Sequence, residues 1–445
     1  MVNHFLQGLF APVTEEVTAL DLPVTGRIPA ELSGRYLRNG PNPIGLEDPA
    51  AYHWFLGAGM VHGVRLRDGR AEWYRNRWVR SRSVAEELGE EWPGGPVHEN
   101  MDFAANTHVI GHAGRTFALV EAGARPYELS YELDTAGPCD FGGTLPGGLS
   151  AHTKRDPRTG ELHTISYFFG WDHLQYVVVD AAGQVGKTVN IPVAGSPMVH
   201  DLALTQRYAV IYDLPVTFSL DVLNAGGNIP YAWDDAHQAR VGLLPRDGSA
   251  EDVRWIDIEP CWVFHTLNAY DDGDQVVVDL AKFPKFMQGG RLQGNPEPVL
   301  DRWIIDPAAG KVLQETRDDR GQEFPRVDER VVSLPHRYGY TVRSAESIFD
   351  DKAGMALLKH DYRTGRTEEH WHAPGAGFAE AVFVPSAPDA AEDDGYVMSL
   401  VFDPGRGATD LVILSAQDFT GEPVARVHLP ARIPLGFHGN WIADQ

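Results

Sequence analysis

The chain has 445 residues, of which 43% are hydrophobic and 22% charged, a balance that supports a sizeable folded core and argues against disorder. Its 38 Lys and Arg against 62 Asp and Glu give a formal net charge of −24, which would repel a phosphate backbone, so we expect no nucleic-acid partner. The two cysteines, Cys139 and Cys261, are too few for a disulfide framework or a cysteine-based zinc site.

The first motif along the chain is HFLQGLF (residues 4–10), whose apolar residues recur at helix-like spacing. Such a stretch could lie on a membrane surface, or it could pack against the rest of the protein. No run approaches the roughly 18 apolar residues of a membrane span, and no signal-peptide pattern opens the sequence. We therefore expect a soluble, cytoplasmic protein with at most peripheral membrane contact.

Short apolar runs, rich in Val, Ile and Tyr and bounded by turn residues, predict strands along the whole chain. They lie at residues 176–180, 208–214, 276–283, 302–306, 396–403 and 410–414. The 46 Gly and 31 Pro are scattered, which divides the chain into short elements and leaves little room for long helices. The pattern predicts an all-β protein.

A turn motif recurs within this pattern, in which a strand ends in Asp and Gly follows three or four residues later. It is found at residues 156–160, 180–183, 306–310, 361–365 and 418–421. The Asp side chain can cap a turn while Gly adopts the positive φ that a hairpin needs. Asp306, Asp361 and Asp418 recur at nearly equal intervals. A period of about 57 residues is typical of hairpin-rich propeller blades, of which the chain would hold seven or eight; a sandwich or barrel is the alternative.

The chemistry of the chain is best sought among its histidines. No Gly-rich turn follows a strand and opens a helix, and no Gly-x-Ser-x-Gly occurs, so nucleotide binding and a hydrolase nucleophile are not supported. Of 18 histidines, four lie among apolar or small residues near predicted strand ends: His152, His200, His265 and His438. Their successive spacings are near one, one and three repeat intervals. Equivalent positions on separate blades face the propeller axis, so the four could share one metal ion; the alternative is hydrogen-bonded core histidines.

Seven motifs, in order, resemble those of the carotenoid cleavage oxygenases, and they span nearly the whole chain. They are FLQGLFAPV (5–13), GRYLRNGPNP (34–43), HWFLGAGMVHG (53–63), PRVDERVV (325–332), PHRYGY (335–340), AVFVP (381–385) and GFHGNW (436–441). The resemblance implies a seven-bladed β-propeller, with a dome of loops and short helices over the metal-bearing face. It also implies that residues 1–445 form a single domain.

The resemblance further implies a non-haem Fe(II) ion on the propeller axis. The ligand positions of the family match the four histidines named above. Three glutamates match the family's partners of those ligands: Glu121 for His200, Glu329 for His265 and Glu380 for His438. His152 is left without a carboxylate partner. A carboxylate on the outer ring N–H would hold each imidazole in the ligating tautomer.

The activity that the resemblance implies is oxidative cleavage of a C=C bond of a carotenoid or apocarotenoid by O₂, giving two carbonyl products. Cleavage of a stilbenoid or phenylpropenoid alkene is the alternative, and isomerisation without O₂ also occurs in the family. Stilbenoid-cleaving members carry a lysine just before the first of the glutamates, where this chain has Val120, which disfavours a 4-hydroxystilbene. A non-catalytic propeller that binds a ligand is a third hypothesis.

An apolar conjugated substrate needs an apolar tunnel, and the 10% aromatic content supplies residues for one. Four aromatic residues beside the matched motifs are candidates for substrate contacts: Phe55, Trp262, Phe264 and Trp441. Core packing is the alternative for each of them. No organic cofactor is expected besides the ferrous ion.

Overall fold

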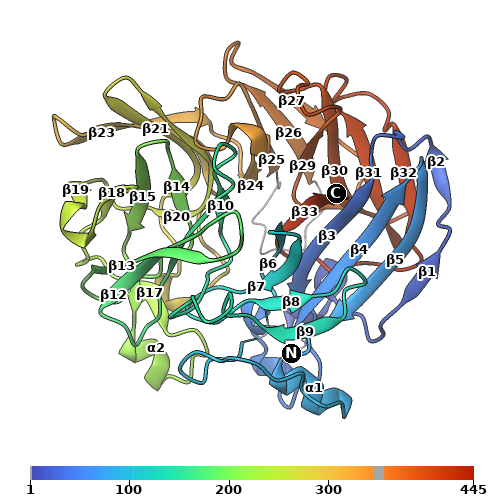
Figure 1. The fold of residues 1–445 in the computed structure, drawn as a ribbon, viewed down its shortest axis with the longest axis horizontal. Coiled ribbons are helices and arrows are strands. Elements are labelled where there is room, and N and C mark those ends of the chain that lie inside the picture. Colours follow the sequence, from blue (N-terminus) through green and yellow to red (C-terminus); the bar gives the residue numbers. More distant parts are fainter. Residues whose placement is uncertain (1–2, 104, 344–354, 445) are drawn as a thin grey trace. The chain divides into compact units, whose positions relative to one another are not determined.

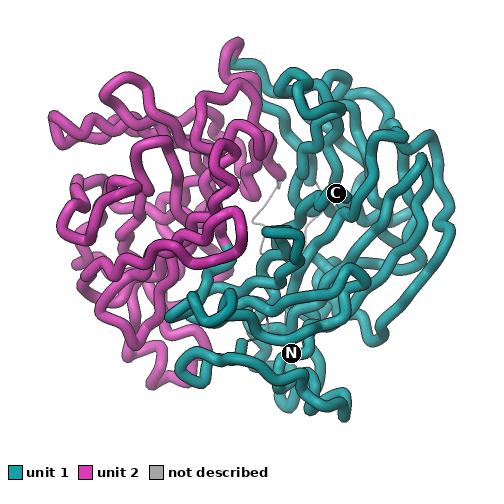
Figure 2. The backbone as a smooth tube through the Cα atoms, in the orientation of Figure 1, with its two compact units in different colours: residues 1–151, 351–360, 365–445 teal, residues 152–350, 361–364 magenta. Residues whose placement is uncertain are grey.

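The structure is a computed structural model that describes residues 3–103, 105–343 and 355–444. Its backbone divides into two compact units (Figure 2). Unit 1 comprises residues 1–151, 351–360 and 365–445, and unit 2 comprises residues 152–350 and 361–364. The single domain predicted for residues 1–445 stays a prediction.

The described residues form seven antiparallel sheets of four or more strands and one two-stranded sheet (Figure 1). In most sheets the strands are hydrogen-bonded in chain order, as in the series β10-β11-β12-β13. Five of these seven sheets have four strands and two have more, and such meanders are the blades of a β-propeller. The all-β class and the seven-bladed propeller are therefore confirmed, and each of the six apolar runs named above lies in a strand to within one residue.

Unit 2 contains three complete blades and the two-stranded sheet. The first blade consists of β10 (Lys154–Arg155), β11 (Leu162–Ser166), β12 (His173–Val179) and β13 (Val185–Pro192). The second consists of β14 (Leu202–Leu204), β15 (Tyr208–Asp213), β18 (Arg240–Pro245) and β19 (Arg254–Asp257). The third consists of β20 (Trp262–Asp272), β21 (Gln275–Phe283), β22 (Val299–Asp306) and β23 (Lys311–Asp318). The small sheet pairs β16 (Val216–Phe218) with β17 (Tyr231–Trp233).

Unit 1 contains three blades, two of which include strands from the N-terminal part of the chain. One consists of β6 (His108–His112), β7 (Arg115–Leu119), β8 (Tyr127–Leu129) and β9 (Thr135–Pro138). Another joins β1 (Thr18–Leu20), β3 (Gly34–Pro41), β4 (Gly59–Arg67) and β5 (Arg70–Trp78) to the C-terminal β33 (Gly439–Ala443). The third joins β2 (Val24–Gly26) to β28 (Gly377–Phe378), β29 (Val382–Pro385), β30 (Gly395–Asp403), β31 (Ala408–Ser415) and β32 (Ala425–His428).

The seventh blade consists of β24 (Gln322–Arg326), β25 (Tyr338–Arg343), β26 (Ala356–Asp361) and β27 (Arg366–His370). Helices are short, as the scattered Gly and Pro predicted. Among the described residues, the α-helices are α1 (Arg82–Leu88) and α2 (Leu220–Asn224). The 3₁₀ turns are η1 (His4–Leu6), η2 (Gly8–Phe10), η3 (Pro49–Ala51), η4 (Trp54–Leu56), η5 (Ala250–Asp252), η6 (Gln288–Gly290) and η7 (Glu329–Val331).

The Asp–Gly turns close hairpins, and four of the five join the third strand of a blade to its fourth. In the β22–β23 turn, Asp306 Oδ1 accepts from the N–H of Ala309 at 2.9 Å and Gly310 has a φ of +63°. Gly365, between β26 and β27, has a φ of +71°. A residue with a Cβ is strained in this left-handed region, which explains why glycine recurs with the blades.

The N-terminal motif packs against the protein. Gly8 has a φ of +55°, and η1 and η2 replace a continuous helix. Phe5 and Phe10 are buried, with ring centroids 5.8 and 5.0 Å from that of Trp54. The packing alternative therefore holds for these two residues. Among the described helices, none is both long and apolar enough to cross a membrane.

Candidate metal centre

Three of the four predicted ligands lie in unit 2, each at the first strand of a blade. His152 and His200 each stand two residues before a strand, β10 and β14 respectively, and His265 lies within β20. The first strands are neighbours, since β10 contacts β14 and β14 contacts β20. Equivalent positions on adjacent blades thus bring together three histidines that are each about one blade apart in the sequence.

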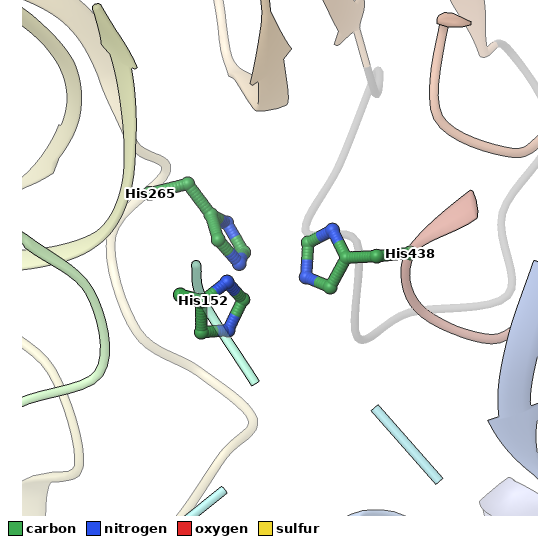
Figure 3. Close-up of side chains that lie close together, drawn as sticks. All are labelled: His152, His265 and His438. Carbon is green, nitrogen blue, oxygen red and sulfur yellow. The ribbon is translucent and has the colours of Figure 1, made fainter. Parts of the chain in front are cut away.

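The rings of these three histidines form a compact group. The His200 Nε2 and His265 Nε2 atoms are 3.3 Å apart. The ring centroid of His152 lies 4.2 Å from that of His200 and 4.9 Å from that of His265. In Figure 3 the rings of His152 and His265 turn toward each other. Two imidazole nitrogens bound at about 2.1 Å to one ion are roughly 3.0 to 3.4 Å apart, so the His200–His265 separation suits a shared metal.

A β-bulge directs the His265 side chain into this group. The pairing of β20 with β21 shifts register between Val263 and Thr266, so Phe264 and His265 have no regular partner across the ladder. A bulge bends its strand and re-aims the side chains at the irregularity. The apolar sequence WVFHTLNAY predicted a strand, but it carries no local signal for this irregularity.

The carboxylate that orients His265 is Glu323, so the prediction of Glu329 is wrong. The Nδ1 atom of His265 is 2.6 Å from Glu323 Oε2, and the Glu323 side chain is fully buried. Glu329 opens the 3₁₀ turn η7, is 51% exposed, and accepts from the Arg326 guanidinium at 2.9 Å. Because the His265 Nδ1–H donates to Glu323, the Nε2 atom keeps the lone pair that a metal requires.

The repeat interval contained a signal for Glu323. Glu323 follows His265 by 58 residues, close to one blade, and lies in β24, the first strand of the next blade, which contacts β20. Glu329 lies beyond the end of that strand. A register shift after Glu323 and a φ of +52° at Phe324 mark another irregularity, and the Phe324 ring stacks on His265 with centroids 5.5 Å apart.

The fourth predicted ligand, His438, lies in unit 1 directly before β33. Its Nδ1 atom is 2.9 Å from Glu380 Oε1, and Glu380 Oε2 accepts from the N–H of Gly439 at 3.1 Å. Both side chains are buried. The predicted pairing of Glu380 with His438 is therefore present, and it leaves the His438 Nε2 atom as the one that can ligate.

His108 is a further buried histidine that the sequence analysis missed. It is the first residue of β6, a position like that of the candidate ligands, but its ring nitrogens bridge two neighbours. Nδ1 is 3.0 Å from the Ala151 carbonyl oxygen and Nε2 is 2.9 Å from Asn440 Nδ2. His108 therefore supports the chain beside His438, with ring centroids 5.2 Å apart, and acts as a hydrogen-bonded core residue.

Two of the predicted substrate-contacting residues lie beside the histidines of unit 2. The Phe264 ring meets that of His200 edge-on, with centroids 4.6 Å apart. Trp262 is fully buried and packs on Phe264 at 5.4 Å and on Phe286 at 6.1 Å. The aromatic side chains thus form an apolar wall next to His200.

The other two predicted contact residues lie in unit 1 and differ from each other. Phe55 is half-buried in η4, with its ring 5.8 Å from that of Phe437, the residue before His438. Trp441 packs against a hydrophobic core cluster that includes Tyr36, and its ring lies against Gly34 at the start of β3. Trp441 is therefore partly buried against the core, and its contact with a substrate stays a prediction.

Glu121 lies in unit 1 just after β7 and is half-buried. The residue before it, Val120, is buried. The predicted pairing of Glu121 with His200 stays a prediction.

Comparison with known proteins identifies relatives over almost the entire chain. Residues 10–443 match the family described as retinal pigment epithelial membrane protein. A carotenoid cleavage oxygenase of Mycobacterium tuberculosis is 48% identical, covering 99% of this chain and 97% of that protein. An isoeugenol monooxygenase of Pseudomonas nitroreducens is 31% identical, covering 98% of this chain and 97% of that protein.

Solved structures share the fold over nearly the full length. A lignostilbene dioxygenase from Pseudomonas brassicacearum superposes with a TM-score of 0.89 and 27% identity, covering 99% of each chain. A cobalt-substituted apocarotenoid oxygenase from Synechocystis has a TM-score of 0.85 and 28% identity, covering 97% of each chain.

Proposed function

Because the chain belongs to the retinal pigment epithelial membrane protein family, whose members include carotenoid cleavage oxygenases, we propose that it is a non-haem Fe(II) dioxygenase that cleaves a C=C bond of a carotenoid or apocarotenoid. The products are two carbonyl compounds. The observation that carries the proposal is the His200–His265 pair, with ring nitrogens 3.3 Å apart and Glu323 behind His265.

We propose that one ferrous ion is held by His152, His200, His265 and His438. The chemistry of this donor set fits iron, because imidazole suits Fe, Cu, Ni and Zn, whereas carboxylate-rich sites suit Mg and Ca. When bound, iron supplies redox chemistry toward O₂, which zinc lacks. Four neutral ligands also leave the ion with its full positive charge.

The surrounding residues hold the ligands in their binding form. Glu323 and Glu380 keep the Nδ1 protons of His265 and His438, so that each Nε2 atom points its lone pair away from its carboxylate. Glu121 is proposed to do the same for His200. Phe264 and Phe324 cover His200 and His265 with apolar surface, which favours a conjugated hydrocarbon and excludes water.

A stilbenoid or phenylpropenoid alkene is the second candidate substrate. It is favoured by the likeness to a lignostilbene dioxygenase and to an isoeugenol monooxygenase. Against a phenolic substrate stands Val120, a buried apolar residue at the position where the resemblance places a lysine. We therefore rank the carotenoid or apocarotenoid first.

The test is oxygen uptake by the Fe(II)-loaded protein with a panel of apocarotenals, stilbenes and phenylpropenes, with the aldehyde products identified by mass spectrometry. The proposal expects uptake and two carbonyl fragments with the apocarotenals. Turnover confined to stilbenes or phenylpropenes would favour the second candidate. A His265→Ala variant should abolish uptake, whereas Glu329→Gln should retain it, because Glu329 faces Arg326 on the surface. No uptake with any alkene would overturn the proposal.

A further inference from the structure

A buried carboxylate outside the predicted ligand set joins the three ligand-bearing segments of unit 2. Asp201 follows His200 directly, and its side chain is fully buried. Its Oδ2 atom accepts from Lys154 Nζ and from the Thr266 N–H, each at 2.8 Å, and its Oδ1 atom accepts from the Leu202 N–H at 2.7 Å. Lys154 stands two residues after His152, and Thr266 stands one residue after His265.

We propose that Asp201 is the positioning residue of the metal centre, which holds His152, His200 and His265 in register before a metal binds. This inference rests on the proposed function. Asp201 does not act as a ligand here, because its two oxygens already accept three hydrogen bonds. It acts through the backbone next to the ligands, so that the separations among the three rings are set by the protein.

The chemistry of a carboxylate explains why Asp suits this position. Two acceptor oxygens without a proton can receive one ammonium and two backbone N–H groups at once, and charge-assisted hydrogen bonds are the stronger ones. An asparagine would place an NH₂ group against one of these donors, losing at least one bond and leaving a buried polar group unsatisfied.

Neighbouring contacts strengthen the link at β20. Thr266 lies at the register shift that follows His265, where the ladder alone does not fix the strand. The Thr266 Oγ1 atom is 2.8 Å from the Tyr212 hydroxyl of β15. Thr266 is therefore held at two points, by the bond from its N–H to Asp201 and by the contact of its side chain with Tyr212. The irregular segment that carries His265 therefore depends on Asp201 for its position.

The test is Co²⁺ binding to metal-free protein, followed by visible absorption and by competition with a chromophoric chelator. Asp201→Asn should weaken Co²⁺ binding by about 10- to 100-fold and alter the cobalt absorption bands. The matched control is Asp301→Asn, since Asp301 is equally buried in unit 2 and accepts from Lys282, Trp303 and Thr316, none of which is a candidate ligand or its neighbour in the sequence. The control should lower the thermal midpoint without changing the affinity or the spectrum.

Wild-type affinity and spectrum in Asp201→Asn would overturn the inference, as would an equal loss in Asp301→Asn. If Asp201→Asn does not fold, Lys154→Met decides, because it removes one of the three donors and should weaken Co²⁺ binding several-fold; unchanged affinity would overturn the inference. Failure of the wild-type protein to bind Co²⁺ would instead count against the proposed metal centre itself.

Discussion

Each of the two ring nitrogens of His265 faces a defined neighbour. Its Nδ1–H donates to Glu323 Oε2 at 2.6 Å, and its Nε2 atom faces that of His200 at 3.3 Å. Glu323 Oε2 also accepts from the N–H of Phe324, the residue that follows it. The carboxylate is thereby held in place, which fixes the tautomer of the ring it supports.

Replacing Glu323 should therefore weaken metal binding without removing a ligand. We expect Glu323→Gln to lower the affinity for Fe²⁺ by about 10- to 100-fold, because a neutral amide supports the ring N–H less strongly than a carboxylate. Anaerobic titration of the metal-free protein against a competing chelator measures this. Glu329→Gln is the control and should bind as the wild type does; equal losses in both variants would contradict the assignment of Glu323.

His163, which is not among the candidate ligands, has neighbours that keep its ring neutral. His163 is buried in β11, with Nδ1 at 2.6 Å from the Tyr176 hydroxyl and Nε2 at 3.0 Å from an Arg246 nitrogen. Burial and the Arg246 charge lower its pKa to about 3. Arg246 can donate only to an unprotonated Nε2, so the geometry requires the neutral ring. The carboxylates of Asp156 and Glu161 also bond Arg246.

The lowered pKa of His163 predicts that the folded protein loses stability in acid. The folded pKa of His163 lies below its ordinary value of about 6.5, so its contribution is complete above that pH and is lost as the pH falls toward 3. Between pH 7 and pH 5 the loss is about 2 kcal/mol. Urea unfolding of metal-free protein at both pH values should show that His163→Gln decreases the drop by this amount. An unchanged drop would show that the ring is protonated in the folded protein.

The hairpin turns between strands account for the repeat of the blades. Gly310 closes the β22–β23 turn at a φ of +63°, and a Cβ built there would meet no atom within 4 Å. Any cost of a side chain at this position is therefore conformational and not steric. Gly186 offers the same open space from an exposed position within β13, and its φ is not positive.

These two glycines predict opposite effects of the same substitution. Gly310→Ala should lower the free energy of unfolding by about 1 kcal/mol, because alanine is strained at positive φ. Gly186→Ala should raise it by about 0.5 kcal/mol, because alanine restricts the unfolded chain and is not strained by a positive φ at this open position. Urea denaturation of both variants measures the difference, and a change of the same sign in both would contradict the turn assignment.

A metal that binds only the folded chain must stabilise the fold as a whole. At free Fe²⁺ about 100-fold above its dissociation constant, the gain is about 2.7 kcal/mol. We expect anaerobic denaturation to show this gain in the wild type and not in His265→Ala. The matched control is His428→Gln. His428 is the last residue of β32, its Nδ1 atom lies 3.0 Å from Asp410 Oδ1 in β31, and its replacement should leave the full gain in stability from Fe²⁺. Equal stability with and without Fe²⁺ would contradict a folded-state metal site.

How much of the site could be predicted depends on how far apart in the sequence the interacting residues lie. Strand runs, hairpin turns and the four histidines could be recognised because each depends on a few neighbouring residues or on a motif. The packing of Trp441 against the core could not be predicted in the same way, because it depends on the pairing of β33 with β3, which comes from the opposite end of the chain.

The amino-acid order alone therefore determined the all-β class, the blade interval and the candidate ligands, since alternation, turn chemistry and family motifs are properties of short segments. Only the folded chain shows that Glu323 and not Glu329 supports His265, and that Asp201 joins segments from three blade-length stretches of the chain. These contacts are made across neighbouring blades, and those of His265, Thr266 and Glu323 lie at irregularities of the ladder, so sheet packing and not local pattern sets which side chains meet.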